Sequence, residues 1–339
     1  MLVELLTQLV VVVALLLAIF IPLCIGWGRI KRTRQEWQSR LRQSTPVAAI
    51  VVVVLLINRF ARPRLPDLSW AIDWNLTPVF YAIEGEAVVW FQAFASPALT
   101  QYFSFIYIYG YAFMLIFPVI AYFALSDTYP LRKLLSAYAL NYVIGLVIYL
   151  LVVAYGPRNL MPEMIETALY DFNPQYQSLT SEVNHNTNVF PSLHTSLSAT
   201  IALFAYRTRR SYPIWFVVSV PLAVSVAIST MYLGIHWAID VAGGIVLALV
   251  TVKASDQLVG RWSLSEDFGI DLEAYESRLK RTLGRDDQLD TNDRMSESVS
   301  EADAQTDSRP DTSGVDRPAE LERTTQSGAG NENGENDKI

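Results

Sequence analysis

Apolar residues in this chain are gathered into long runs, without the regular alternation of a half-buried soluble domain. Seven runs contain or approach the roughly 20 residues that cross a bilayer as a helix. They lie at 2–27, 45–57, 99–125, 134–155, 192–206, 213–231 and 236–253, and the second spans only with help from its flanks. The pattern predicts an all-α integral membrane protein with about seven transmembrane helices.

The stretch 58–96 interrupts this pattern because it is polar, is broken by prolines and carries tryptophan at intervals. Tryptophan favours the headgroup level of a membrane, so we expect interfacial helices lying on the outer leaflet. Such helices would act as a lid or lipid-entry gate over a site, or would simply pack against the bundle. Glu84 and Glu86, the notable acidic residues here, are interpreted as solvated carboxylates.

Basic residues are concentrated in three of the segments that join the runs. They fall within 29–42, at 132–133 and within 207–210, and alternating spans bring all three segments to one membrane face. By the positive-inside rule this face is cytoplasmic, which puts the N-terminus outside and the C-terminus inside. Glu4 stands where a cleaved signal peptide would be basic, so the first run is expected to remain as a helix. The predicted location is the cell membrane.

Composition agrees with a membrane protein and separates the tail from the rest. Of 339 residues, 52% are hydrophobic and 17% are charged. Residues 1–255 hold 16 basic and 12 acidic residues, a balance of +4, while 256–339 hold 10 and 21, a balance of −11, which together give −7. From 285 onward the chain is polar with hardly an aromatic residue, so we expect an acidic, largely disordered cytoplasmic tail.

Three segments follow from these patterns: an extra N-terminal helix with its basic loop (1–44), a membrane core (45–256) and the tail (257–339). Only 5 of the 26 basic residues are lysine. A lysine-poor, acidic soluble segment is typical of proteins in high-salt cytoplasm, so a halophilic source is predicted. No nucleic-acid motif, Gly-rich phosphate loop or internal repeat is evident.

Candidate chemistry is concentrated in two short blocks at the edges of apolar runs. Ionisable groups are costly there and suggest a function, and His194 and His236 are two of only three histidines. Asp240 follows His236 by four residues, so on a helix both would share one face, and the carboxylate would hold one imidazole nitrogen and leave the other as a nucleophile. Pro191-Ser192 is typical of a helix start, whose N–H groups accept a phosphate oxygen.

Less specific interpretations remain beside this one. A His-x3-Asp spacing is common by chance, and a histidine near the interface is often only a hydrogen-bonding residue. His185 is interpreted as a loop residue, and Cys24 lies inside the first apolar run without a partner thiol. By ligand type, His194, His236 and Asp240 could also bind a metal.

These blocks resemble the type 2 phosphatidic acid phosphatase (PAP2) superfamily. Its second and third motifs read Pro-Ser-Gly-His and Ser-Arg-x5-His-x3-Asp, and this chain has Pro191-Ser192-Leu193-His194 and Ser229-Thr230-x5-His236-x3-Asp240. The Phe-Pro-Ser-Leu-His block and the Tyr-Leu-x2-His-x3-Asp-x2-Gly-Gly block are similar to the branch that holds inositolphosphorylceramide synthase. The resemblance covers roughly residues 130–250 and implies a six-helix core.

The first motif of the superfamily, Lys-x6-Arg-Pro, has only a partial counterpart. Gly156-Pro157-Arg158-Asn159 supplies the arginine, Leu151 stands in place of the lysine, and Thr230 replaces the arginine of the third motif. Two cations of the phosphatase pattern are therefore missing. Arg158 itself could instead extend to the headgroups from a helix end.

The resemblance implies metal-independent phosphoryl transfer on membrane lipid substrates, without a cofactor. His236 would attack phosphorus, Asp240 would fix its tautomer, and His194 would protonate the leaving oxygen. Arg158 and Ser192 would bind the non-bridging oxygens. Three functions stay open: transfer of a phospho-headgroup between lipids, hydrolysis of lipid phosphates or polyprenyl diphosphates, and a non-enzymatic membrane scaffold.

The small residues at the end of the second block are interpreted as structural. Ala242-Gly243-Gly244 would allow another helix to approach closely.

With one arginine and no lysine, the site would suit a phosphodiester, which carries one charge, better than a monoester, which carries close to two. Alternatively Arg59, Arg62 or Arg64 of the interfacial stretch would fold over the site and restore the missing charge.

Overall fold

The computed structural model describes residues 2–165 and 188–259, which belong to one compact unit. All regular structure in these ranges is helical, as the sequence predicts, apart from two isolated β-bridges. The predicted tail from 285 and His185 lie outside the described residues. The elements are α1 (Leu2–Phe20), η1 (Ile21–Ile25), α2 (Trp27–Ala61), η2 (Arg62–Arg64), α3 (Leu65–Ile72), α4 (Thr77–Glu84), α5 (Val89–Gln92), α6 (Pro97–Phe105), η3 (Ile106–Gly110), α7 (Tyr111–Phe123), α8 (Tyr129–Leu151), α9 (Pro157–Leu160), α12 (Leu193–Arg207), α13 (Pro213–Tyr232) and α14 (Ala238–Leu258).

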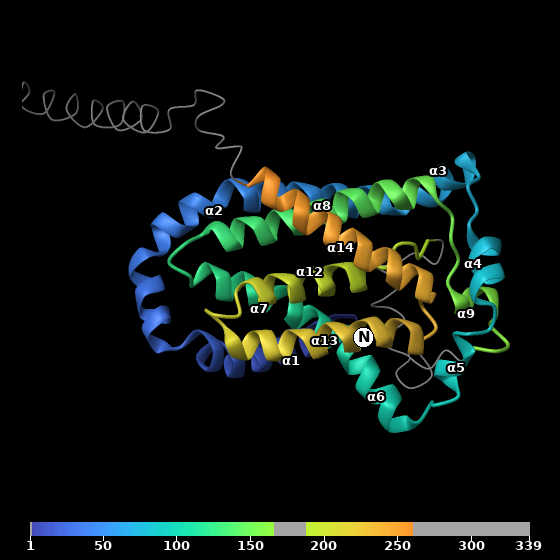
Figure 1. Ribbon diagram of the computed structural model, residues 1–339, viewed down its shortest axis with the longest axis horizontal. Helices are drawn as coiled ribbons and strands as arrows, with labels where there is room; N and C mark the ends of the chain where they lie inside the picture. The colour runs from blue at the N-terminus through green and yellow to red at the C-terminus, as the bar shows by residue number, and fades with distance from the viewer. Residues whose placement is uncertain (1, 166–187, 260–339) are drawn as a thin grey trace, which may run out of the picture. The chain divides into compact units, whose positions relative to one another are not determined.

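Six helical segments in the described ranges are long and apolar enough to cross a membrane, which confirms a multi-pass membrane protein. They are Val3–Ile25, Trp27–Ile72, Pro97–Phe123, Tyr129–Leu151, Pro213–Tyr232 and Ala238–Leu258. The remaining predicted span corresponds to α12, which has 15 residues and packs against α7, α8, α13 and α14 (Figure 1). Its neighbours shield this shorter helix, so it does not need a full apolar length.

The basic segment 29–42, expected to be a loop, is instead the first half of α2. Figure 1 shows this half crossing one end of the bundle before the helix turns along it, and Pro46 lies inside the helix. Arg40 is buried, pairs with Glu36 at 2.7 Å and donates to the carbonyls of Phe123 and Leu125 at the end of α7. A cation there satisfies carbonyls that the helix leaves open, and this contact holds the first half of α2 against the end of α7.

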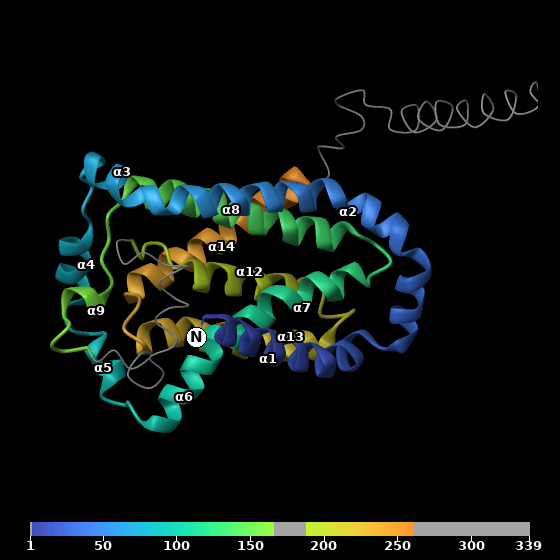
Figure 2. The same ribbon diagram turned by 180° about the vertical axis from the view of Figure 1, so that it is seen from behind.

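The stretch 58–96 divides into two parts. Its beginning extends α2 through η2 into α3, which differs from the predicted interfacial arrangement, while α4 and α5 cross the end of the bundle (Figure 2). Chain segments at this end are tied by two parallel bridges, Asn75 with Val153 and Ala154 with Asn188. Val153 accepts from Leu76 N at 2.9 Å, so the segment after α8 is held between two others.

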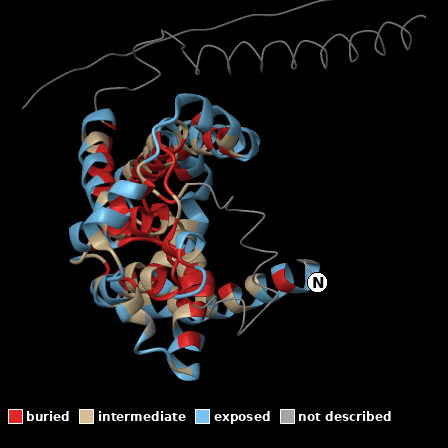
Figure 3. Cartoon of the chain, turned by 90° about the vertical axis from the view of Figure 1, so that its right-hand side faces the viewer, coloured by how far each residue is buried: buried red, intermediate tan, exposed pale blue. Residues whose placement is uncertain are grey.

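Burial follows the arrangement expected in lipid. Buried residues lie toward the middle of the bundle (Figure 3). Large apolar side chains such as those of Val217 and Val246 are exposed. Asn141 on α8 is fully buried and donates to Thr251 on α14 at 2.9 Å and to Thr200 on α12 at 3.3 Å. These hydrogen bonds fix three helices against one another where apolar burial alone gives little preference.

The two ends of the bundle differ in content. The turns rich in basic residues lie where α7 meets α8 and α12 meets α13, while α9 and the first residues of α12 and α14 lie at the opposite end with α3–α5 (Figures 1 and 2). The predicted site residues belong to this second end.

Candidate active site

His236 and Asp240 are in contact, but they do not share a helix face. Helix α14 begins at Ala238, and Trp237 is its N-cap, so His236 lies before the helix. The Asp240 carboxylate reaches back from the first turn and accepts from Trp237 N at 2.8 Å, in a capping-box arrangement. This brings Oδ2 to 3.3 Å from His236 Nδ1. The predicted pair therefore forms through the helix cap and not through helical periodicity.

Both members of this pair are shielded from solvent, which strengthens the electrostatic interaction between the carboxylate and the imidazole ring. His236 is 4% exposed and Asp240 is fully buried. Oδ1 of Asp240 has no hydrogen-bond partner among the described residues. A buried carboxylate beside one imidazole nitrogen holds the ring in the tautomer that leaves Nε2 open, and it stabilises positive charge that develops on the ring.

The turn that carries His236 also holds the first-motif segment. Thr230 O, at the end of α13, accepts from the backbone N–H groups of Ile235 and His236. Arg158 N donates to Gly234 O at 3.0 Å. A Cβ on Gly156 would lie 2.4 Å from Ile235 O, so only glycine permits this approach. The structure thus places the Arg158 backbone directly against the turn before His236.

Ser192 is the N-cap of α12, as the sequence predicts for a helix start. Its hydroxyl is fully buried and accepts from Thr195 N at 3.4 Å and from Thr195 Oγ1 at 3.0 Å, which leaves its own O–H proton to donate. Ser192 N donates to Asp240 O at 3.1 Å and joins the starts of α12 and α14. A Cβ on Gly244 would lie 2.5 Å from Ser192 O, which confirms the predicted close contact.

His194, in the first turn of α12, lies between two tyrosine rings that sequence reasoning missed. Its ring centroid is 4.5 Å from that of Tyr107 and 4.3 Å from that of Tyr111. Tyr107 belongs to η3, a π-helical turn, and such turns occur frequently at functional sites. His194 is partly exposed, and its block meets the His236 block where Ser192 N donates to Asp240 O at 3.1 Å. The two blocks that carry the histidines are therefore brought together.

Arg62 also approaches this site from η2. Its guanidinium carbon lies 5.4 Å from the centre of the Tyr149 ring. The Tyr149 hydroxyl donates to Pro191 O at 3.0 Å, directly before the N-cap of α12. Arg62, one of the three arginines named as alternatives from the sequence, therefore lies near the start of α12.

Glu84 is not the solvated carboxylate that we expected. It accepts from Ala238 N at 2.8 Å and from Ile239 N, so α4 caps the first turn of α14. Glu86, two residues on, is exposed. The sequence carried no indication of this contact, because 154 residues separate Glu84 from Ala238.

Two positions that carry cations in the phosphatase pattern are occupied by Leu151 and Thr230 in this chain. Neither residue supplies a group that replaces the missing positive charge. Leu151 is 40% exposed on the outside of the bundle. The Thr230 hydroxyl is buried and donates to Ala227 O at 2.7 Å, and the Ser229 hydroxyl donates to Val226 O. Neither α13 hydroxyl is therefore directed at a phosphate. In the described part of the chain no group of three or more His, Cys, Asp or Glu side chains is arranged around a common ion site.

This fold and site define a multi-pass membrane protein in which a buried His–Asp pair, a second histidine and two arginines gather at one end of a helical bundle. The model of the PAP2 superfamily matches residues 81–254, just over half of the chain, and the chain belongs to this superfamily. The match includes every predicted site residue and excludes Arg62. Membership supports a phosphatase or phosphotransferase type of function on lipid phosphates.

One curated relative is an uncharacterized protein of Methanocaldococcus jannaschii, which is 27% identical over 169 residues. The alignment covers 50% of this chain and 66% of the relative, so the chain spans just under two thirds of the relative's length. No solved structure matches the chain.

Proposed function

We propose that the protein transfers a phospho-headgroup from a lipid phosphodiester, such as a phosphoinositol or phosphoglycerol lipid, to the hydroxyl of a second lipid through a phosphohistidine at His236. The observation that carries this proposal is the buried contact of 3.3 Å between His236 Nδ1 and Asp240 Oδ2, with the His194 block joined to it by the hydrogen bond from Ser192 N to Asp240 O. One histidine is held as a nucleophile, and the other is partly exposed and available for proton transfer.

In the first step His236 Nε2 attacks phosphorus, the bond to the donor lipid's oxygen breaks, and His194 protonates that oxygen. In the second step His194 removes the proton of the acceptor hydroxyl, whose oxygen attacks phosphorus and displaces His236. Asp240 stabilises the imidazolium in between. Arg158, the Ser192 proton and the first N–H groups of α12 hold the non-bridging oxygens.

Charge favours a diester as the donor. The phosphoryl group of a diester carries one negative charge, and Arg158 matches it beside a helix N-terminus. The two further cations of the phosphatase pattern are replaced by Leu151, on the outside of the bundle, and Thr230, which bonds its own helix. A second negative charge would find less compensation there, and uncompensated charge near a bilayer is costly.

Arg62 supports a second candidate, hydrolysis of a lipid monophosphate or polyprenyl diphosphate. With Arg158 it makes two cations at one end of the bundle, which match a dianion. Water would then replace the lipid alcohol as the acceptor, and inorganic phosphate or a lipid monophosphate would be released.

Purified protein in bilayers separates the two candidates. It should be offered a lipid monophosphate, a polyprenyl diphosphate, and a phosphoinositol or phosphoglycerol lipid together with a lipid alcohol. We expect a new headgroup-bearing lipid that forms only with the diester and the alcohol, detected by mass spectrometry, and lost in His236→Ala. Rapid phosphate release from either of the first two substrates without headgroup transfer would overturn the diester proposal and select the hydrolase.

A further inference from the structure

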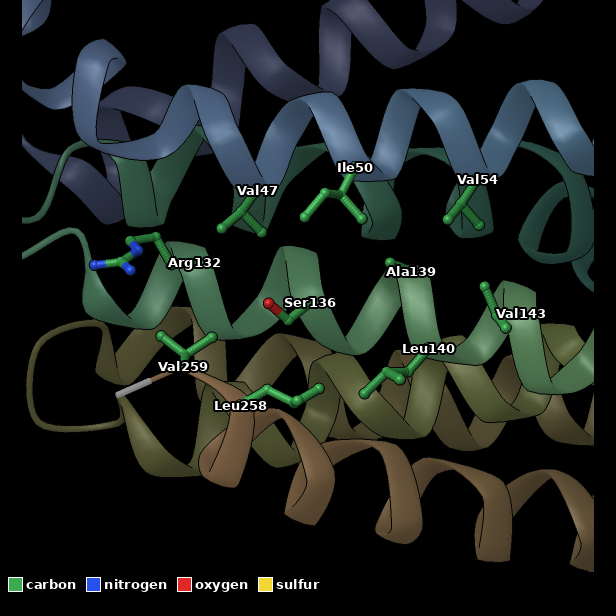
Figure 4. Close-up of a pocket in the computed structure, with 10 residues that line it drawn as sticks. All are labelled: Val47, Ile50, Val54, Arg132, Ser136, Ala139, Leu140, Val143, Leu258 and Val259. Atoms are coloured by element: carbon green, nitrogen blue, oxygen red, sulfur yellow. The ribbon is translucent and has the colours of Figure 1, made fainter. Parts of the chain in front are cut away.

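An apolar cleft runs along the outside of the bundle, at the end away from the candidate active site. It has a volume of about 320 Å³ and lies between α2, α8 and the last turn of α14 (Figure 4). Its walls are branched apolar side chains at helical spacing, namely Val47, Ile50 and Val54 on α2, and Leu140 and Val143 on α8. These walls face the region that lipid chains occupy in a membrane.

The length of the cleft corresponds to one leaflet. Its lining extends along α8 from Arg132 to Val143, eleven positions, which is about 16 Å at the helical rise per residue. Half of a hydrocarbon core of roughly 30 Å is about 15 Å. The dimensions therefore suit a single hydrocarbon chain that enters from one membrane surface.

One end of the cleft is positively charged. Figure 4 shows the Arg132 guanidinium at this end, with the Ser136 hydroxyl one turn further along the same face. Arg132 Nε is buried and has no hydrogen-bond partner among the described residues. It also stands in the first turn of α8, where the helix dipole is positive and a cation is unfavourable. Both features call for an anion beside Arg132.

The acidic residues at this end are already engaged. Asp256 pairs with Lys133 at 2.6 Å and with Arg207 at 2.9 Å. Asp127 accepts from Tyr129 N at 2.8 Å, and no ion pair within the described ranges joins it to Arg132. The charge beside the cleft is therefore not neutralised by the described part of the chain.

We propose that this cleft binds an anionic phospholipid, with one acyl chain between α2 and α8 and its phosphate against Arg132 and Ser136. An apolar chain suits the walls, and a phosphate suits a guanidinium at a helix N-terminus. The site is separate from the His236 site and lies at the opposite, basic end of the bundle. It selects lipids by headgroup charge, because a zwitterionic headgroup presents its own cation beside Arg132.

Native mass spectrometry of the purified full-length protein, titrated with phosphatidylglycerol or phosphatidylcholine, tests the proposal. We expect one phosphatidylglycerol to bind at least about fivefold more tightly than phosphatidylcholine, the factor that one cation near the membrane surface provides. Arg132→Gln should reduce this preference to near one. Arg209→Gln, which removes a charge at the same end but outside the cleft, should retain it. Equal affinities in the unaltered protein, or an unchanged preference in Arg132→Gln, would overturn the proposal.

A second pair of variants tests the chain-binding part of the cleft. Val143→Phe adds volume to its lining, whereas Val147→Phe adds the same volume on an outward-facing position of α8 that does not line it. We expect weaker binding of phosphatidylglycerol in the first variant only, and equal affinities in both would contradict the assignment.

Photocrosslinking identifies the occupant directly. With benzoylphenylalanine at Leu140 in the full-length protein, we expect lipid adducts that contain phosphatidylglycerol in mixed vesicles with phosphatidylcholine. Crosslinks to a peptide from residues 260–339 would instead show that the chain's own tail fills the cleft, and the proposal would be wrong.

Discussion

At the scale of single residues, the Asp240 carboxylate contacts His236 and also supports the start of α14. The carboxylate has two roles, because Oδ2 lies near His236 Nδ1 and also caps Trp237 N. Replacing it by the isosteric amide keeps most of the shape but removes the charge that stabilises the imidazolium. A test of the mechanism must therefore distinguish loss of charge from loss of the cap.

We predict that His236→Ala and Asp240→Asn each lower kcat by about 10³-fold or more, because the nucleophile and its orienting group act as a unit. His194→Ala should trap phosphorylated enzyme when the donor has a good leaving group, since its proton is then least needed. Radiolabelled donor and the acid lability of phosphohistidine provide the measurement. Near-normal turnover in His236→Ala would rule out the phosphohistidine route.

Arg62 allows a prediction that separates substrates. Arg62→Gln should lower kcat/KM for a lipid monophosphate about tenfold more than for a diester, because the dianion depends more on a second cation. Arg64→Gln is the matched control. Arg64 belongs to the same short helix as Arg62, but its guanidinium donates to Phe60 O of α2 at 2.9 Å. Equal losses for both substrates would assign Arg62 a packing role on Tyr149.

At the scale of elements, the site depends on how α14 begins. Its first N–H groups are satisfied from two directions, by Asp240 within the helix and by Glu84 from α4. Helix α4 therefore helps to fix the start of α14, whose Asp240 contacts the candidate nucleophile His236. If His236 is the nucleophile, this contact would affect catalysis although α4 contributes no reacting group.

We predict that Glu84→Ala lowers the free energy of unfolding by about 1 kcal/mol, a typical loss for a helix cap, and reduces kcat with little change in KM. Glu86→Ala, an exposed neighbour, should leave both unchanged. Thermal unfolding in detergent and steady-state kinetics provide the readouts. If both variants behave alike, the cap does not position the site.

Close packing of α12 against α14 allows a second test at this scale. We predict that Gly244→Ala destabilises the protein by about 1–3 kcal/mol, because the new methyl group would lie 2.5 Å from Ser192 O. Gly28→Ala is the control, since a Cβ there has no atom within 4 Å. Thermal unfolding with a ligand-independent probe measures both, and unaltered stability in Gly244→Ala would show that the helices separate readily.

At the scale of the whole molecule, the turns rich in basic residues and the candidate site residues lie at opposite ends of the bundle. The positive-inside rule then predicts that the active site faces the outside of the cell and the basic end faces the cytoplasm. In a Cys24→Ser background, Ala87→Cys and Ser126→Cys place exposed thiols at the two ends.

We predict that a membrane-impermeant maleimide labels Ala87→Cys in intact cells and labels Ser126→Cys only after permeabilisation. Labelling in the reverse order would place the site on the cytoplasmic leaflet and would change the lipids available as donor and acceptor. The unlabelled Cys24→Ser protein is the background control.

The sequence by itself determined the class of structure and indicated most residues of the candidate site. Long apolar runs dictate helices because an unpaired backbone cannot remain in lipid, and this holds whatever the helices pack against. His194, His236 and Asp240 were identifiable because ionisable groups at the edges of such runs are expensive. These are local properties of the chain, and the family match covers the same blocks.

Only the tertiary structure decided how the pieces meet. Arg40 of the basic segment 29–42 reaches the end of α7, and Glu84 caps α14 from a distant helix. The contact of His236 with Asp240 arises from a cap and not from helical spacing. Tyr107 and Arg62 join the site through folding alone. Each of these contacts joins groups whose partners depend on how the chain packs, and no local pattern encodes that packing.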